Sequence, residues 1–312
     1  MQELDAALSL ASYLTTREKT VLRNRLDSLD TLSVLSIEEL SQIVGRPVTA
    51  NFWNPAVLAH DGIRVVHLCH KLGIEGVSYS EPKYPALLRE TVNAPYMLYY
   101  RGNLNSLQEK TVSVVGSRRV CRECAQAAFD FARDASYDGC TVVSGNACGI
   151  DSFAHKGALA SSKGATVAVL PCGIDSIVPS ANTTLARHII ESGGALVSEY
   201  APGLPVEKWR FVQRNRIIAA LSPVTVVVEA PDGSGALITA DFAVDFNRDV
   251  VFHRSCFCEE AKKIPGRKKL REKNVRTALS FVESGAPIID GYADMVSVLQ
   301  SAPGTRQAEL FE

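Results

Sequence analysis

Five short apolar segments, each followed by small residues, constrain the fold of this 312-residue chain most strongly. The first is Val114-Val-Gly-Ser-Arg-Arg119, where a β-branched run stops at Gly116 and a helix-like segment follows. The other four are Thr141–Ser144, Thr166–Leu170, Ala195–Ser198 and Val224–Glu229. Buried strands that alternate with helical segments predict an α/β fold with a parallel sheet, and such sheets bind ligands at the carboxyl ends of their strands. All five loops are expected at that edge.

The loop after the first segment has the composition of an anion site. Backbone N–H groups at a helix start, together with the guanidinium of Arg118, suit a phosphate. A guanidinium at a strand end also serves in many proteins to hold a neighbouring loop, so both interpretations of Arg118 remain open.

A second group of cations is interleaved with aromatic residues. Lys208, Arg210, Arg214 and Arg216 surround Trp209 and Phe211. A groove for an unpaired nucleic-acid strand needs cations along the phosphates and flat rings for the bases. Alternatively, the aromatics belong to the core and the arginines pair with carboxylates such as Glu199 or Glu229. The nearby strand-end loops favour the groove.

Composition limits the class of protein. The formal net charge is -1, so a nucleic-acid site must be a local cluster. The sequence contains no apolar run long enough to span a bilayer and no basic segment preceding an apolar one at its start. We therefore expect a cytoplasmic protein with no membrane partner.

The eight cysteines permit a metal hypothesis. Cys121-x-x-Cys124 has metal-ligand spacing, whereas Cys256-x-Cys258 lies far downstream and has the wrong spacing for a chelating knuckle. A zinc site requires the two motifs to meet. Because small buried thiols are common in cytosolic cores, we expect no metal.

The sequence divides into three parts. Residues 1–78 show helical patterning and resemble SAM or helix-hairpin-helix modules, with Ser36 as a cap before 37–44 and Gly45 ending that helix. The Gly turn has no basic cluster beside it, which favours a packing role over direct DNA binding. Residues 79–300 contain the sheet, and residues 301–312 are expected to be a flexible tail.

Motifs in residues 80–300 together resemble the DNA processing protein A (DprA/Smf) family. The motifs, in chain order, are Tyr84-Pro85, Ala94-Pro-Tyr-Met-Leu-Tyr-Tyr-Arg-Gly102, Val115-Gly-Ser-Arg118, Ser144-Gly145, Gly149-Ile-Asp151 with His155, Asn182, Ser198-Glu199, Phe211-x-x-Arg214-Asn-Arg-Ile-Ile218, Glu229-Ala230, Ser234-Gly235 and Thr239-Ala240. The run Phe-x-x-Arg-Asn-Arg-Ile-Ile is the most specific of them.

The resemblance implies an extended Rossmann-like sheet with helices on both faces, preceded by the helical module. It implies a dimer that binds and protects single-stranded DNA and helps load the RecA recombinase during natural transformation and recombination. It implies neither catalytic activity nor a cofactor. The family's DNA pocket corresponds here to Gly116, Ser117, Arg118, the Ser144-Gly145 loop, Lys208 and Phe211.

Combining residues and resemblance gives the predicted site. The expected nucleic-acid-binding residues are Gly116, Ser117, Arg118, Arg119, Ser144, Gly145, Gly149, Lys208, Phe211, Arg214, Asn215, Arg216, Ser234 and Gly235. The expected supporting residues are Asp151, His155, Glu229 and Thr239. For several of these a structural role competes: Asp151 as a helix cap, His155 in a structural hydrogen bond, Asn215 bonded to backbone, and Ser234-Gly235 at a close strand-helix approach.

The chain departs from the family pattern at several positions. Cys124 and Asn247 stand where the family usually has Gly, Asn146 replaces a Leu, and Val178 replaces a Tyr. The Pro-Gly after the last core strand is replaced by Val251-Phe-His-Arg-Ser-Cys256. Residues 259–277, with eight Lys or Arg against three acids, form an apparent insert. We expect its basic part, from Lys262 to Arg276, to be a mobile surface segment, either adding non-specific affinity for nucleic acid or simply solvated.

An enzyme of the phosphoribohydrolase-like Rossmann group is the main alternative. Its glycine motif ends in a catalytic carboxylate, but in Pro231-Asp-Gly-Ser-Gly-Ala-Leu-Ile-Thr239 that position is Thr239. Without the carboxylate, acid/base chemistry at this place is difficult to build.

The tail contains Gln307-Ala-Glu-Leu-Phe311. A polar anchor followed by two apolar residues resembles the peptide that docks into the replication sliding clamp. Packing of these residues on their own domain or on a dimer partner is the competing interpretation.

Overall fold

The computed structural model describes residues 1–161, 164–266 and 276–301. The chain divides into two compact units. The first consists of residues 1–101, 172–176 and 197–206, and the second of 102–171, 177–196 and the described residues from 207 onwards. No helix in these described parts is long and apolar enough to cross a bilayer.

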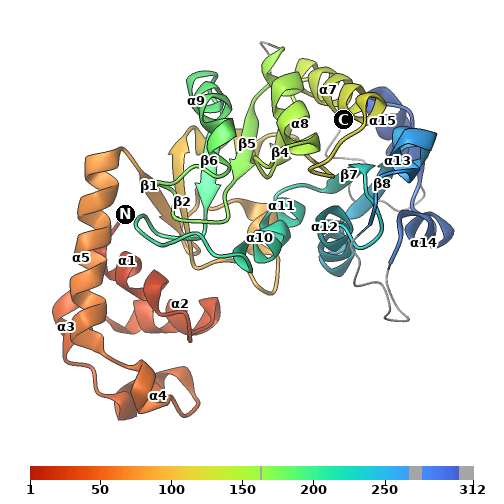
Figure 1. Ribbon diagram of the computed structural model, residues 1–312. Helices are drawn as coiled ribbons and strands as arrows, with labels where there is room; N and C mark the ends of the chain where they lie inside the picture. Colours follow the sequence, from red (N-terminus) through yellow and green to blue (C-terminus); the bar gives the residue numbers. More distant parts are fainter. Residues whose placement is uncertain (162–163, 267–275, 302–312) are drawn as a thin grey trace. The chain divides into compact units, whose positions relative to one another are not determined.

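The first unit is mainly helical (Figure 1). Its elements are α1 (Glu3–Leu10), α2 (Thr16–Arg25), α3 (Leu29–Ser33), α4 (Ile37–Val44), η1 (Ala50–Phe52), α5 (Pro55–Leu72), β1 (Glu75–Ser78), α6 (Ala86–Arg89) and β2 (Met97–Gly102). Strands β1 and β2 pair antiparallel. Ser36 and Glu39 form a capping box at the start of α4, and Gly45 ends the helix with a φ of 76°. Both predicted boundaries of α4 are thus confirmed.

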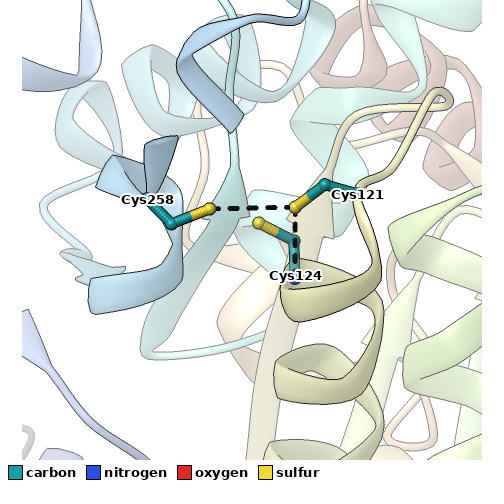
Figure 2. A group of neighbouring side chains, drawn as sticks. All are labelled: Cys121, Cys124 and Cys258. Carbon is teal, nitrogen blue, oxygen red and sulfur yellow. Dashed lines mark hydrogen bonds between the residues drawn. The ribbon is translucent and has the colours of Figure 1, made fainter. Parts of the chain in front are cut away.

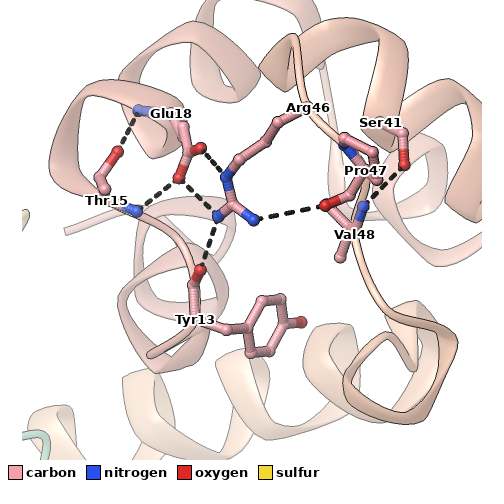
Figure 3. Close-up of polar contacts among 7 residues, drawn as sticks. All are labelled: Tyr13, Thr15, Glu18, Ser41, Arg46, Pro47 and Val48. Atoms are coloured by element: carbon pink, nitrogen blue, oxygen red, sulfur yellow. Dashed lines mark hydrogen bonds and ion pairs between the residues drawn. The ribbon is translucent and has the colours of Figure 1, made fainter.

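The turn after α4 is held by a polar network (Figure 3). Arg46 donates from Nε to Glu18 Oε1 over 2.6 Å and from Nη2 to the carbonyl of Tyr13 over 2.9 Å. Glu18 also accepts from the backbone N of Thr15, closing the capping box of α2. The hydrogen bond from Arg46 lowers the pKa of Glu18. The cation beside the Gly45 turn is therefore engaged within its own module.

The second unit is an α/β layer structure. Its elements are η2 (Leu104–Gln108), β3 (Thr111–Gly116), α7 (Arg122–Tyr137), β4 (Thr141–Ser144), α8 (Ile150–Leu159), β5 (Thr166–Val169), η3 (Ser180–Asn182), α9 (Thr183–Glu191), α10 (Arg210–Gln213), α11 (Asn215–Ala220), β7 (Val224–Glu229), α12 (Gly235–Asp245), β8 (Asp249–His253), η4 (Arg254–Phe257), α13 (Glu259–Lys262), α14 (Ala278–Glu283), β9 (Ile288–Ile289) and α15 (Tyr292–Ser301). Strand β6 (Ala195–Ser198) is divided between the two units.

Six strands of this unit are ordered β5-β4-β3-β7-β8-β9, and the paired strands are all parallel. Chain order runs outward from β3 through β4 to β5, then returns to the other side of β3 with β7. The gap between the ends of β3 and β7 is therefore the topological switch point, where open α/β sheets bind ligands. The predicted parallel sheet is confirmed.

Helices cover both faces of the sheet (Figure 1). Alternate strand residues such as Val112, Val114 and Val226 pack in one cluster with α7, α8 and α15. The residues between them face α11 and α12: Ser113 donates to the carbonyl of Ile218 over 2.7 Å, and Thr111 to that of Leu221 over 2.9 Å. The sheet is buried on both faces, which explains the nearly continuous apolar strands.

Part of the predicted insert is described. Helix α13 buries Ala261 in the core, and Arg276 forms an ion pair with Asp241 over 2.9 Å. Residues 267–275, with most of the basic charge, lie outside the described residues, as does the tail from 302 to 312.

Candidate nucleic-acid site

A cavity of about 390 Å³ lies at the switch point between β3 and β7. The loop after β3 lines one side, from Val115 to Arg119, and the loop after β7 lines another, from Pro231 to Ala236. Predicted site residues at its wall are Gly116, Ser117, Arg118, Arg119, Asp151, Phe211, Arg214, Asn215, Ser234, Gly235 and Thr239. Most of the predicted site thus converges on one hollow.

Two glycines allow the loop after β3 to approach α8. A Cβ on Gly116 would lie 2.4 Å from Ile150, and one on Gly149, whose φ is +84°, would lie 2.2 Å from the carbonyl O of Ser117. Ser117 Oγ accepts from the backbone N of Arg119 over 3.1 Å and closes a tight turn. The turn leaves Arg118 and Arg119 exposed at the cavity wall.

The guanidinium of Arg118 lies over the ring of Phe211, 5.1 Å from its centroid. Phe211 is half-buried and lines the cavity, while Lys208, three residues earlier, is exposed but does not line it. Trp209 is 52% exposed. Arg210 forms an ion pair with Glu207 over 3.2 Å. For this arginine the structure supports the alternative in which the cations pair with carboxylates.

Arg214 is buried, with 3% of its surface exposed. Its Nη1 donates to the carbonyl of Gly145 over 2.5 Å and also to that of Val169. A Cβ on Gly145 would lie 2.3 Å from this nitrogen, which explains the glycine. Arg214 therefore ties the ends of β4 and β5 together while lining the cavity.

Neighbouring residues of the same motif are also engaged with the fold. Asn215 donates from Nδ2 to the carbonyl of Gly235 over 3.1 Å, as in the backbone-bonding alternative. Arg216 is buried and does not line the cavity in the described structure. Ser144 is buried too and donates to the carbonyl of Val114 over 2.7 Å.

Asp151 and His155 differ in their relation to the cavity. Asp151 lines it and accepts from the backbone N of Ala147 over 3.2 Å. Burial raises the pKa of Asp151, while the Arg214 charge acts in the opposite direction. His155 is fully buried outside the wall, with Nδ1 2.7 Å from Thr166 Oγ1, and burial lowers its pKa to about 3. The structural role of His155 is therefore the better supported alternative.

Glu229 and Thr239 complete the predicted set. Glu229 is buried behind the loop, and its Oε2 accepts from the backbone N of Cys121 over 3.3 Å. Burial raises its pKa to about 7. Thr239 donates to the carbonyl of Gly235, one turn earlier in α12, over 3.1 Å. Neither side chain presents a free acid or base to the cavity.

Sequence reasoning missed several wall residues. Asp232, Val212 and the segment 264–266 also line the cavity. Asp232 lies in the Pro231–Gly235 loop and was available from the strand-end pattern. Segment 264–266 does not follow a predicted strand and lies within the predicted insert, so nothing in the sequence indicated that it lies at the cavity.

The cysteine motifs also meet in the fold. Cys258 lies beside Cys121 and Cys124, while Cys256 is not part of this group in the described chain. A zinc site requires the two cysteine motifs to lie together. In the structure, one cysteine of the second motif, Cys258, lies beside both cysteines of the first.

Comparisons with known proteins identify the family of this chain. The family model of DNA recombination-mediator protein A matches residues 75–300. Protein Smf of Synechocystis is 35% identical over 227 residues, covering 72% of this chain and 53% of that protein. DNA processing protein DprA of Streptococcus pneumoniae is 40% identical over 167 residues, covering 54% of this chain and 58% of that protein. The chain thus spans about half the length of the curated relatives it matches.

Two solved structures are similar over longer stretches. The X-ray structure of DNA processing protein A from Streptococcus pneumoniae has a TM-score of 0.73 and 28% identity, covering 95% of this chain and 98% of that one. DNA processing protein A from Helicobacter pylori, whose structure describes a single-stranded DNA binding mode, has a TM-score of 0.59 and 25% identity, covering 72% and 95%. Because the family model covers most of the sequence, the chain belongs to the DNA recombination-mediator protein A family.

Proposed function

We propose that this chain binds single-stranded DNA at the cavity between β3 and β7. The observation that carries the proposal is the exposed Arg118 guanidinium stacked on Phe211 at the wall of a hollow formed by strand-end loops. A cation beside a half-buried ring offers a phosphate partner and a stacking face within one nucleotide's reach.

The charges around the cavity favour a polyanion. Arg118, Arg119 and Arg214 line it, against Asp151 and Asp232. Burial raises the pKa of Asp151, while the charges of Arg214 and Arg118 act in the opposite direction. Lys208 adds an exposed cation near Phe211. Such a site neutralises backbone charge without reading bases, so binding is expected to be independent of sequence.

The comparisons support the choice of ligand. The Helicobacter pylori relative is described through its single-stranded DNA binding, and its fold is shared here. A ring at the wall of the cavity suits unstacked bases better than a duplex, whose bases are stacked on each other. We therefore expect a clear preference for single strands.

The cellular role we infer is protection of single strands and loading of the RecA recombinase in natural transformation and recombination, by a homodimer in the cytoplasm. The family's description as a recombination mediator supports this role. Docking of Gln307–Phe311 on the sliding clamp stays a prediction, because that peptide lies outside the described residues.

The binding proposal is tested with the full chain. Fluorescence anisotropy compares a labelled oligothymidine with a duplex of equal length over a salt series. We expect tighter binding of the single strand and affinity that falls steeply with salt. Equal affinity for both ligands, or no binding at low salt, would overturn the proposal.

The loading proposal has its own measurement. RecA ATP hydrolysis is followed on single strands coated with single-strand-binding protein, with and without the chain. We expect a shorter lag when the chain is present, and a variant that has lost DNA binding should leave the lag unchanged. An identical lag with the wild-type chain would argue against loading.

A further inference from the structure

Three thiols from distant parts of the sequence lie together at the start of α7 (Figure 2). The sulfurs of Cys121, Cys124 and Cys258 all lie within 4.8 Å of one another. Those of Cys121 and Cys258 are 3.9 Å apart. Tetrahedral zinc with bonds of about 2.3 Å to sulfur separates its thiolates by about 3.8 Å, so the observed spacing suits one ion.

The fold explains why these cysteines meet. Cys121 is the N-cap of α7, its Sγ accepting from the backbone N of Cys124 over 3.4 Å, so the Cys-x-x-Cys pair occupies the first helical turn. Cys258 precedes α13, which follows β8 through η4. Because α13 packs into the core cluster together with α7, it carries Cys258 to the start of that helix.

The three sulfurs differ in position and in exposure. Helix α7 is 16 residues long, and Cys121 lies at its positive end. Cys124 is buried, whereas Cys121 and Cys258 are half-buried, so an ion would be reachable from solvent on one side.

A buried carboxylate supplies an independent sign of a ligand. Glu229 is completely buried, and its Oε1 has no hydrogen-bond partner among the described residues. Its Oε2 accepts from the backbone N of Cys121, and its side chain also interacts with Cys124. Unpaired buried carboxylate oxygens are costly, and a cation at the neighbouring thiols would offset that cost.

We propose that Cys121, Cys124 and Cys258 bind one zinc ion. Each thiol gives its proton to solvent on binding, and the three thiolates form three corners of a tetrahedron around the ion. A water molecule takes the fourth corner on the exposed side, and Glu229 supports the site from the buried side. The ion links the start of α7 to α13 and so holds together two segments that are 137 residues apart in the sequence.

Cobalt is the probe, because tetrahedral thiolate coordination gives Co²⁺ intense visible bands and near-ultraviolet charge transfer. The full chain is stripped of metal under reducing conditions and titrated with Co²⁺, then with Zn²⁺. We expect a tetrahedral spectrum that saturates at one ion per chain and disappears when zinc displaces cobalt. A higher melting temperature with zinc is expected too, because the ion binds the folded chain preferentially.

Matched variants locate the site. Cys121→Ser and Cys258→Ser should each lose the tetrahedral spectrum, whereas Cys148→Ser, which alters an exposed cysteine outside the group, should keep it. Glu229→Gln should weaken zinc binding by about 10–100-fold, as loss of a supporting partner does. Circular dichroism on each variant separates loss of metal from loss of fold.

Three results would overturn the proposal. One is a folded wild-type chain with no tetrahedral spectrum. Another is an effect of Cys148→Ser equal to that of Cys258→Ser, which would indicate non-specific thiol binding. The third is peptide mapping that finds a Cys121–Cys258 disulfide in chain kept reduced, since a bonded pair requires the sulfurs to be about 2.05 Å apart and leaves none to bind metal.

Discussion

The guanidinium of Arg118 stacks on the ring of Phe211, with 5.1 Å between Arg118 Cζ and the ring centroid. One residue comes from the turn after β3 and the other from α10. Cation–π contact orients the exposed arginine without using its N–H donors, so these donors remain available to a ligand. The pair links the electrostatic and stacking parts of the proposed site, and the first two predictions separate these parts.

Removing an exposed cation should reduce the salt dependence of DNA binding. We expect Arg118→Ala and Lys208→Ala each to reduce the slope of log affinity against log salt by about one, because each removes about one phosphate contact. Anisotropy titrations of oligothymidine at several salt concentrations measure the slope. Arg187→Ala, which removes an exposed arginine on α9 outside the cavity, is the control and should leave it unchanged. A double Arg118/Lys208 variant with wild-type affinity would contradict the site.

Removing the ring should weaken binding without changing its salt dependence. Phe211→Ala is expected to cost about 1–3 kcal/mol of binding free energy, because base stacking is lost while the phosphate contacts remain. Phe211→Tyr keeps an aromatic face and should bind nearly as tightly. The same titrations measure both variants. If Phe211→Tyr loses as much DNA affinity as Phe211→Ala, the result argues against base stacking on this ring.

Arg214 should contribute to stability as well as to the wall of the cavity. Arg214→Ala leaves the buried carbonyls of Gly145 and Val169 without this donor, at about 1–3 kcal/mol for each group that stays unpaired. We expect a lower denaturation midpoint in urea than for Arg118→Ala, whose side chain is exposed. Equal midpoints for the two variants would show that the buried contacts contribute little.

His155 should make the fold sensitive to acid. Burial lowers its pKa from 6.5 to about 3, so between these values the unfolded chain binds a proton that the folded chain does not. The free energy of unfolding therefore decreases as pH falls through this range. In urea titrations from pH 6.5 to 4, we expect the free energy of unfolding of His155→Gln to decrease less than that of wild type. His188→Gln, on the exposed side of α9, is the control and should follow wild type.

The cavity should not hydrolyse nucleotides. Thr239 occupies the place of the carboxylate that a phosphoribohydrolase needs, and its hydroxyl is bonded within α12. We expect no release of base from nucleoside monophosphates by chromatography. Release that Asp151→Asn or Glu229→Gln abolishes would identify an enzyme instead.

Local sequence determined much of the scaffold. Five apolar runs predicted the strands β3 to β7, because residues buried on both faces of a sheet must be apolar throughout. Ser36 and Gly45 predicted the ends of α4, because capping depends on side chains within a few residues. The strand-end loops likewise predicted the edge of the sheet at which the cavity lies. Strand β1 was not anticipated, since Glu75-Gly-Val-Ser78 contains a single large apolar residue, Val77.

Tertiary structure alone decided which of the predicted binding residues are exposed. Arg118 and Lys208 are exposed, whereas Arg214 and Arg216 are buried, although the sequence predicted all four as nucleic-acid-binding residues. The exposure of a guanidinium depends on which carbonyls and carboxylates the rest of the chain brings to it, and those partners are distant in sequence. The same reason hid the meeting of Cys121 with Cys258: each motif is local, but their separation is set by the packing of α13 and α7 in one core.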